Sequence, residues 1–168
     1  MDKLFFADES VHIGYDKLIN DINSILDDPQ ILNEKNAYKI FAHLTRSLAY
    51  DYPICLCDHE FPGKVLKPES KEFIFENIDQ IIDKIKKNKN WKLHLFTSGT
   101  TGAPKKISHR FDTITRGVRT GKNYRDNIWA LAYHPAHMAG IQVFFQALMN
   151  KNPLINIFNK PPDVVRHL

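Results

Sequence analysis

Hydrophobic residues recur at every third or fourth position in four segments of the chain, the spacing typical of helices that bury one face. These segments are 15–28, which ends before Pro29, then 33–50, 69–90 and 138–152. The pattern is strongest in the third segment, where one face carries Ile74, Ile78, Ile81, Ile82 and Ile85. Lysines gather at the C-terminal end of that segment, where the helix dipole favours positive charge. We therefore expect four amphipathic helices.

Short hydrophobic runs between these helices predict buried β-strands. The runs cover 52–58, 91–97, 127–135 and 153–159, and the polar segment 105–110, KKISHR, can form a further strand. A further helix is expected over 111–124, beginning near Asp112, although Gly117 and Gly121 weaken it. Strands that alternate with helices indicate an α/β fold, a layered domain with a largely parallel sheet flanked by helices. We expect residues 1–168 to form one domain.

The composition narrows the class of protein without identifying a function. A chain of 168 residues that is 43% hydrophobic and 25% charged is long enough to bury a core and is typical of globular proteins. Its net charge of +4 suits phosphate-bearing ligands and nucleic acid equally. No apolar run approaches the roughly 20 residues of a membrane span. The acidic N-terminal stretch also lacks the basic and apolar regions of a signal peptide. We expect a cytoplasmic protein without a membrane span.

Two cysteines, Cys55 and Cys57, alternate on an expected strand. Their spacing matches neither a redox CxxC motif nor, without a second cysteine pair, a zinc site. We expect two reduced thiols, at least one of them in the core.

The stretch LHLFTSGTTGAPKKISH, residues 93–109, combines a strand, a loop of small polar residues and a second strand. The loop offers hydroxyl groups from Thr97, Ser98, Thr100 and Thr101, close backbone approach at Gly99 and Gly102, and a positive charge on Lys105. Such a set suits a polyphosphate, whose oxygens require several convergent donors and a cation. A Walker A loop is excluded because no glycine stands immediately before Lys105 and because the segment after Lys105 is expected to be a strand. A plain hairpin turn rich in glycine, serine and threonine remains the alternative.

The string FTSGTTGAPKKISH resembles the phosphate-binding signature of the adenylate-forming superfamily, which includes acyl-CoA and aryl-CoA synthetases, adenylation domains and luciferases. The match covers 97–105, and Lys106 stands where the family typically has glycine. A second segment, 130–158, resembles the family's next region, and the succinylbenzoate–CoA ligase branch is similar here. On that alignment His137 takes the place of the family's histidine near the acid pocket, and Gly140 that of the following glycine.

The resemblance implies an enzyme that activates a carboxylic acid with ATP, assisted by Mg²⁺, to an acyl-adenylate that a thiol of CoA or a carrier then attacks. It implies phosphate binding by residues 97–105 and an acid pocket formed by His137 and Gly140. The family's adenine-binding motif, its ribose-binding aspartate and its C-terminal lysine have no counterpart in the 168 residues, so no catalytic residue is assigned. The chain is therefore expected to be a truncated, N-terminal part of such a ligase.

Three interpretations stay open. The chain is one part of a ligase that a complementing chain completes, or a phosphate- or nucleotide-binding module derived from that fold, or an interaction domain. A homodimer is the alternative to a complementing chain, because strands that lose their neighbours leave an unpaired edge.

Two other groups of residues could in principle bind a metal ion or a nucleic acid. His134 and His137 are three residues apart, but Pro135 separates them and no carboxylate or cysteine completes a metal site. The basic residues between 110 and 125 have no interleaved aromatic platform for base stacking, and Tyr124 alone is not enough, so we expect no nucleic-acid partner.

Overall fold

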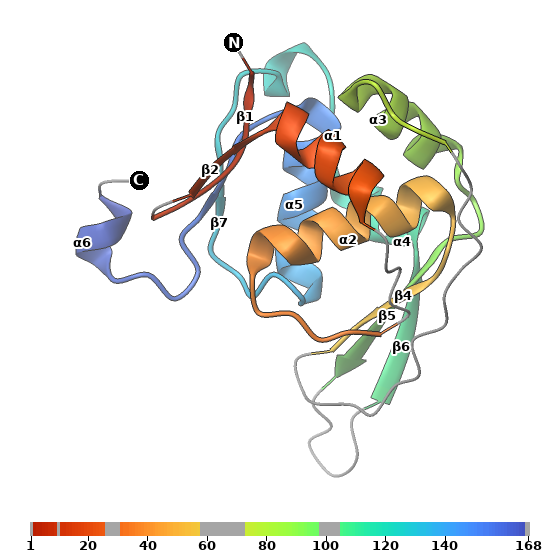
Figure 1. Cartoon of the computed structure of the whole chain (residues 1–168). Coiled ribbons are helices and arrows are strands. Elements are labelled where there is room, and N and C mark those ends of the chain that lie inside the picture. The colour runs from red at the N-terminus through yellow and green to blue at the C-terminus, as the bar shows by residue number, and fades with distance from the viewer. Residues whose placement is uncertain (1, 10, 26–30, 58–72, 98–104, 167–168) are drawn as a thin grey trace.

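The strands of the protein form two four-stranded sheets within the part of the chain that the structure describes (Figure 1). The structure is a computed structural model and describes residues 2–9, 11–25, 31–57, 73–97 and 105–166. The first sheet has the order β2-β1-β8-β7 and the second has the order β3-β4-β5-β6. Their strands are β1 (Leu4–Asp8), β2 (Val11–Gly14), β3 (Ile31–Leu32), β4 (Ile54–Leu56), β5 (Lys92–Thr97), β6 (Lys105–Arg110), β7 (Trp129–Leu131) and β8 (Leu154–Asn156).

Parallel pairing predominates in both sheets. The pairs β1–β8, β7–β8, β3–β4 and β4–β5 are parallel, whereas β1–β2 and β5–β6 are antiparallel hairpins. The expected α/β architecture with a largely parallel sheet is thus confirmed, with its strands divided between two sheets.

Helices cover and connect the two sheets. They are α1 (Tyr15–Ser24), α2 (Ala37–Tyr50), α3 (Ile78–Lys87), α4 (Phe111–Ile114), α5 (Met138–Asn150) and α6 (Pro162–Val165), with 3₁₀ turns at Thr115–Gly117 and Lys122–Tyr124. Asparagine side chains begin two of them: Asn36 accepts a hydrogen bond from the N–H of Lys39 (3.1 Å), and Asn77 accepts one from Gln80 (3.0 Å). No helix among the described residues has the length and apolar character needed to cross a bilayer.

One hydrophobic cluster joins the two layers. Phe5 and Phe6 from β1 belong to the same buried cluster as Leu93 and Leu95 from β5. At its centre the ring of Phe41 on α2 stacks on that of Phe144 on α5, with centroids 4.4 Å apart and an interplanar angle of 2°. The two helices that carry this stack, α2 and α5, cross each other in Figure 1. Because large aromatic rings fill the junction, the sheets share one core.

Two expectations for the helices are wrong in detail. Ile74 does not lie on the buried face of the third helix, since α3 begins at Ile78 and the side chain of Ile74 is 74% exposed. The expected helix over 111–124 is limited to α4 and two short 3₁₀ turns. The later part of the range cannot be helical, because Gly121 adopts a φ of 121° and side chains of α5 bind the backbone of Arg119.

Candidate functional site

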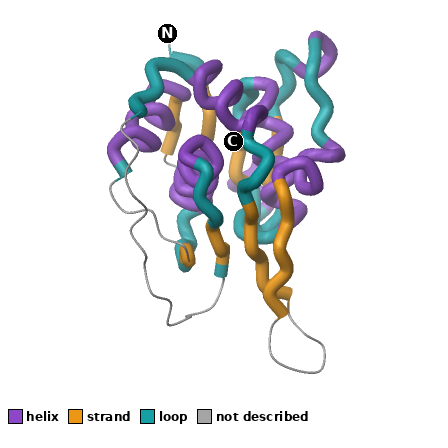
Figure 2. The backbone as a smooth tube through the Cα atoms, turned by 90° about the vertical axis from the view of Figure 1, so that its right-hand side faces the viewer, coloured by secondary structure: helices purple, strands orange, loops and turns teal. Residues whose placement is uncertain are grey.

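The loop with the TSGTTGAPK sequence connects two strands that pair without a register shift. The ladder between β5 and β6 has six consecutive residue pairs, and Thr97 lies opposite Lys105 in the last of them. The expected strand–loop–strand arrangement is therefore confirmed. Both figures of the backbone show this hairpin extending away from the helices (Figures 1 and 2). The two ends of the loop are consequently held together by the ladder.

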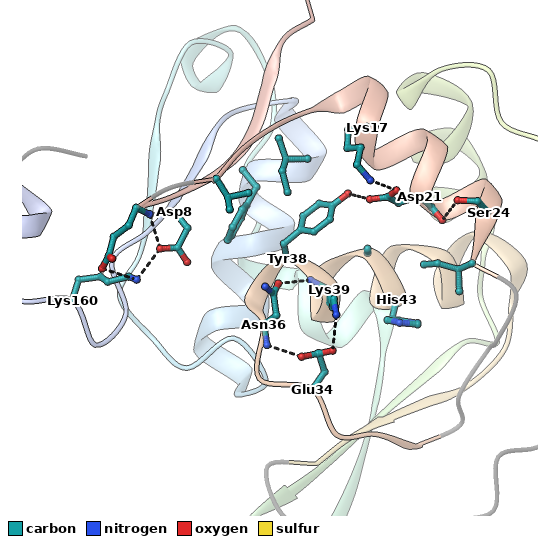
Figure 3. Close-up of a pocket in the computed structure, with 16 residues that line it drawn as sticks. Asp8, Lys17, Asp21, Ser24, Glu34, Asn36, Tyr38, Lys39, His43 and Lys160 are labelled. Atoms are coloured by element: carbon teal, nitrogen blue, oxygen red, sulfur yellow. Dashed lines mark hydrogen bonds and ion pairs between the residues drawn. The ribbon is translucent and has the colours of Figure 1, made fainter.

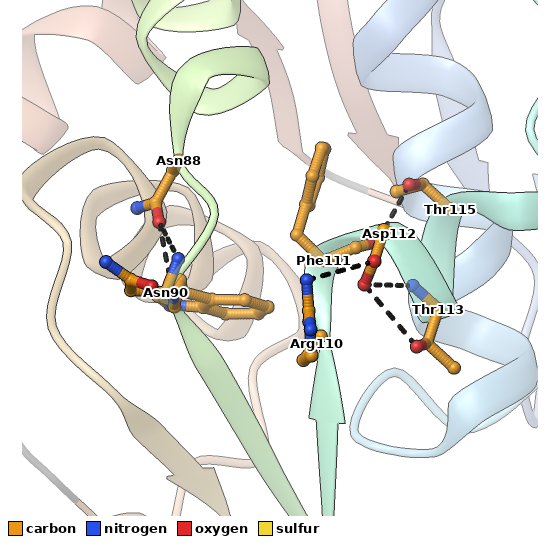
Figure 4. Close-up of polar contacts among 8 residues, drawn as sticks. Asn88, Asn90, Arg110, Phe111, Asp112, Thr113 and Thr115 are labelled. Atoms are coloured by element: carbon orange, nitrogen blue, oxygen red, sulfur yellow. Dashed lines mark hydrogen bonds and ion pairs between the residues drawn. The ribbon is translucent and has the colours of Figure 1, made fainter.

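The alternation of side chains along β5 places one face of this strand against the core. Leu93 and Leu95 are buried, whereas Lys92, His94 and Phe96 alternate with them on the other face. Before β5, the side-chain oxygen of Asn88 accepts hydrogen bonds from the N–H groups of Asn90 (3.2 Å) and Trp91 (3.0 Å). This turn fixes where the strand starts (Figure 4).

The predicted phosphate-binding residues fall partly outside the described part of the chain. Thr97 ends β5 and Lys105 begins β6 with an exposed side chain. The remaining predicted residues, Ser98, Gly99, Thr100, Thr101 and Gly102, lie outside the described residues. Their role in phosphate binding stays a prediction.

The second predicted segment, 130–158, runs from β7 through α5 to β8, and its two histidines lie in the turn between β7 and α5. His137 is the residue before the first turn of α5, and its carbonyl oxygen accepts a hydrogen bond from Ile141 (3.0 Å). Its exposed imidazole faces that of His134, with ring centroids 4.4 Å apart and an angle of 30° between the planes. The N–H of His137 donates to the carbonyl oxygen of His134 (3.0 Å).

His134 is the better anchored of the two histidines. Its Nδ1 accepts a hydrogen bond from the N–H of Ala136 (3.2 Å), so in the neutral ring the proton resides on Nε2. Its ring also packs edge-on against that of Phe158, with centroids 5.3 Å apart and an angle of 78° between the planes. His134 therefore links the ends of β7 and β8 and supports the ring of His137.

Gly140 is buried for a steric reason. A Cβ at this position would lie 2.3 Å from the carbonyl oxygen of His134 and 3.2 Å from the Cα of Pro135. Only glycine allows α5 to approach this turn so closely. The structure thus ties Gly140 to the placement of His134, while its contribution to an acid pocket stays a prediction. The two predicted segments sit on different sheets, the loop on that of β5 and the histidine turn on that of β7.

A groove that the sequence did not predict lies between the β1–β2 hairpin, α1 and α2 (Figure 3). Its volume is about 720 Å³. Lys17 pairs with Asp21, which accepts a hydrogen bond from the Tyr38 hydroxyl (2.5 Å). Burial, followed by the bond to Asp21 and its charge, raises the pKa of Tyr38. The charged groups on these walls pair with one another, so the groove does not indicate a class of ligand. Its residues are far apart in the sequence, so no local pattern predicted the groove.

Both cysteines are buried, which confirms that at least one thiol lies in the core. Burial raises the pKa of Cys55, while a hydrogen bond from Cys57 and the charge of Lys106 act in the opposite direction. The described residues contain no group of three or more His, Cys, Asp or Glu side chains that could hold a metal ion.

The arrangement of the two sheets and their helices is similar to that of adenylate-forming enzymes of known structure. The solved structures that share it include the o-succinylbenzoate–CoA synthetase of Bacillus subtilis in complex with an acyl-adenylate intermediate, with a TM-score of 0.65 and 11% identity over 99% of this chain and 55% of that chain. The same synthetase bound to a product analogue gives a TM-score of 0.66 at 12% identity, over 99% and 43% of the two chains.

A luciferase-like enzyme from the mealworm Zophobas morio has a TM-score of 0.51 at 11% identity, over 98% of this chain and 53% of that chain. The chain spans about half the length of these structures. No protein-family model and no curated protein matches the sequence. The fold agrees with the resemblance found in residues 93–109 and 130–158.

Proposed function

We propose that this chain is the N-terminal part of a ligase that activates a carboxylic acid with ATP. In that reaction a carboxylate oxygen attacks the α-phosphate, forming an acyl-adenylate and releasing pyrophosphate, and the acyl group then passes to the thiol of CoA or a carrier. The observation that carries the proposal is the position of the TSGTTGAPK sequence, which joins β5 to β6 within a fold shared with adenylate-forming enzymes.

The loop would bind the β- and γ-phosphates. The ammonium group of Lys105 would offset their charge, and the hydroxyl groups of Thr97, Ser98, Thr100 and Thr101 would donate to their oxygens. This donor set, with no carboxylate in β5 or β6, fits a triphosphate. We assign no residue to Mg²⁺, because the described residues contain no suitable cluster and the phosphates themselves supply oxygen ligands.

His137 and Gly140 would form part of the acid pocket, with His134 holding the ring of His137 in place. The adenine- and ribose-binding groups would come from polypeptide beyond these 168 residues, which we place on a complementing chain. A phosphate-binding module without ligase activity is the second candidate. It requires only the loop between β5 and β6 and no adenine- or ribose-binding groups.

Calorimetric titration with Mg·ATP of the wild type and of Lys105→Ala tests the role of the loop. We expect the substitution to weaken ATP binding at least tenfold, because it removes a charge-assisted contact of about 1.5–3 kcal/mol. Lys89→Ala, an exposed lysine outside the loop, is the matched control. Equal ATP binding by wild type and Lys105→Ala would remove the loop from the proposal.

Carboxylate-dependent exchange of pyrophosphate into ATP separates the two candidates. A split ligase should show no exchange as the isolated chain and should gain it when the product of the neighbouring gene is added. Exchange by the chain alone would contradict the need for a complementing chain. ATP binding without exchange in either mixture would favour the module.

A further inference from the structure

The solvent-facing side of the β5–β6 ribbon carries a row of cationic and hydrogen-bonding side chains that the proposed nucleotide site does not use. Residues directly opposite each other in an antiparallel ladder share a face, as do alternate residues along a strand. The face opposite to buried Leu93 and Leu95 therefore presents three successive pairs, Lys92 with Arg110, His94 with Ser108, and Phe96 with Lys106.

This face is positively charged along its length. Residues 92–97 and 105–110 contain no acidic side chain. Arg110 reaches Asp112 beyond the end of β6, with Nη2 3.3 Å from Oδ2, but both groups are mostly exposed (Figure 4). Such exposed pairs contribute little. Burial, then the charges of Lys106 and Lys92, lower the pKa of His94, so the positive potential extends to the middle of the row.

These charges lower the stability of the ribbon. Lys92 lies directly opposite Arg110, and like charges in that relationship destabilise a sheet. Lysines on an edge strand often serve only to prevent pairing with other sheets. That explanation accounts for Lys106 on β6, but Lys92 lies on β5, which is paired on both sides, by β4 and β6. An anionic ligand would relieve the repulsion.

The geometry of the row defines the shape of that ligand. Lys92 and Phe96 are four positions apart, which at about 3.3 Å per residue places the pair of Lys92 with Arg110 roughly 13 Å from the pair of Phe96 with Lys106. Between them the imidazole Nδ1 of His94 and the hydroxyl of Ser108 lie 2.7 Å apart and offer polar contacts. A single phosphate cannot reach both ends, whereas a linear chain of phosphates can.

We propose that this face of the β5–β6 ribbon binds an extended chain of phosphates, with Lys92, Arg110 and Lys106 as the charged contacts. Inorganic polyphosphate and the backbone of a single-stranded nucleic acid share this chemistry. Phe96 is the sole phenylalanine, tyrosine or tryptophan among the described residues of the ribbon, so we expect recognition to rest on phosphates more than on stacked bases.

Fluorescence anisotropy of the full chain with labelled polyphosphate, measured between 50 and 200 mM salt, tests the proposal. Three ion pairs predict a slope of log K against log salt of about −2, taking about −0.7 for each contact. That slope corresponds to a loss of affinity of roughly tenfold to twentyfold over this range. Arg110→Gln and Lys106→Gln should each weaken binding several-fold and reduce the slope by about 0.7.

The double variant Lys86→Gln, Lys87→Gln removes two exposed charges from α3 and is the matched control, expected to leave binding within twofold. Equal loss in this control, or an absence of binding at 50 mM salt, would overturn the proposal. Loss of polyphosphate binding in Lys105→Ala but not in Arg110→Gln would also overturn it, by assigning the ligand to the nucleotide loop. A second arm uses oligo(dT). Similar slopes for both ligands support recognition of phosphates, and tenfold tighter binding of oligo(dT) would contradict it.

Discussion

Gly140 packs against the backbone of His134 so closely that a Cβ at position 140 would lie 2.3 Å from the carbonyl oxygen of His134. That oxygen also accepts the N–H of His137, and the two histidine rings face each other across the same turn. The position of the candidate pocket histidine therefore depends on a residue without a side chain.

Gly140→Ala should destabilise the protein by about 1–3 kcal/mol, because the added methyl group must displace backbone and not a flexible side chain. Urea denaturation measures the change. Gly117→Ala is the matched control, since nothing lies within 4 Å of the corresponding Cβ, and it should change stability by less than about 0.5 kcal/mol. Equal effects of the two substitutions would show that the close approach is unimportant.

Phe144→Ala should destabilise the protein by about 3–5 kcal/mol, because it leaves a cavity at the junction of the two sheets. Phe144 is fully buried and stacks on Phe41, with further ring contacts to Phe5 and Phe145. The free energy of unfolding in urea gives the loss. Ile128→Ala is the control because Ile128 is 70% exposed. A loss below 1 kcal/mol for Phe144→Ala would contradict a shared core.

Acid should weaken the contact that joins the C-terminal segment to β1. Lys160 lies 2.8 Å from Asp8 and 2.9 Å from Glu9, and Asn156 donates to Asp8 (2.9 Å). Burial alone would raise the pKa of Asp8, but the bonds from Lys160, Asn156 and the N–H of Glu9, with the charge of Lys160, lower it overall. The stabilisation is complete above the unfolded pKa of about 3.9 and is lost as the pH falls through the folded value.

Asp8→Asn should therefore cost about 1 kcal/mol at pH 7 and progressively less below pH 4, where wild type and variant converge. Urea denaturation at a series of pH values from 7 to 3 gives the difference. A difference that does not change with pH would show that the carboxylate charge does not contribute.

Neither cysteine should react with an aromatic disulfide reagent in the folded protein. Cys55 and Cys57 are each 3% exposed, and burial raises the pKa of Cys55, which suppresses the reactive thiolate. We expect both thiols to be labelled at least a hundredfold faster in urea than in buffer. The absorbance of the released thiolate monitors the reaction. Rapid labelling in buffer would show that β4 opens easily.

The helices could be predicted because their signal is local. The periodic isoleucines of α3 and the hydrophobic residues of α2 and α5 are visible in any short window, and these three helices lie within the predicted ranges, whereas the short helix α6 was not predicted. Ile74 was misplaced because the side chain of Asn77 begins the helix three residues later. A capping asparagine and the spacing of hydrophobic residues can indicate different first residues for a helix. The spacing alone does not show which of them sets the start.

The strands at the N-terminus could not be predicted in the same way. β1 is stabilised by pairing with β8, and the bond from Asn156 to Asp8 spans 148 residues. No local pattern reports such a partner. At the candidate site, the β5–β6 hairpin was predictable from its alternating residues, whereas the reason for Gly140 required the path of the backbone at His134.

The pairing of β1 with β8 has a consequence for synthesis. β1 is translated before every other strand described here, whereas its parallel partner β8, Leu154–Asn156, is the last of them. Until β8 emerges, β1 can pair only with β2 among these strands, and an isolated hairpin is marginally stable. Phe5, whose ring contacts that of Phe144 on α5, therefore cannot complete its packing until α5 and β8 have been made.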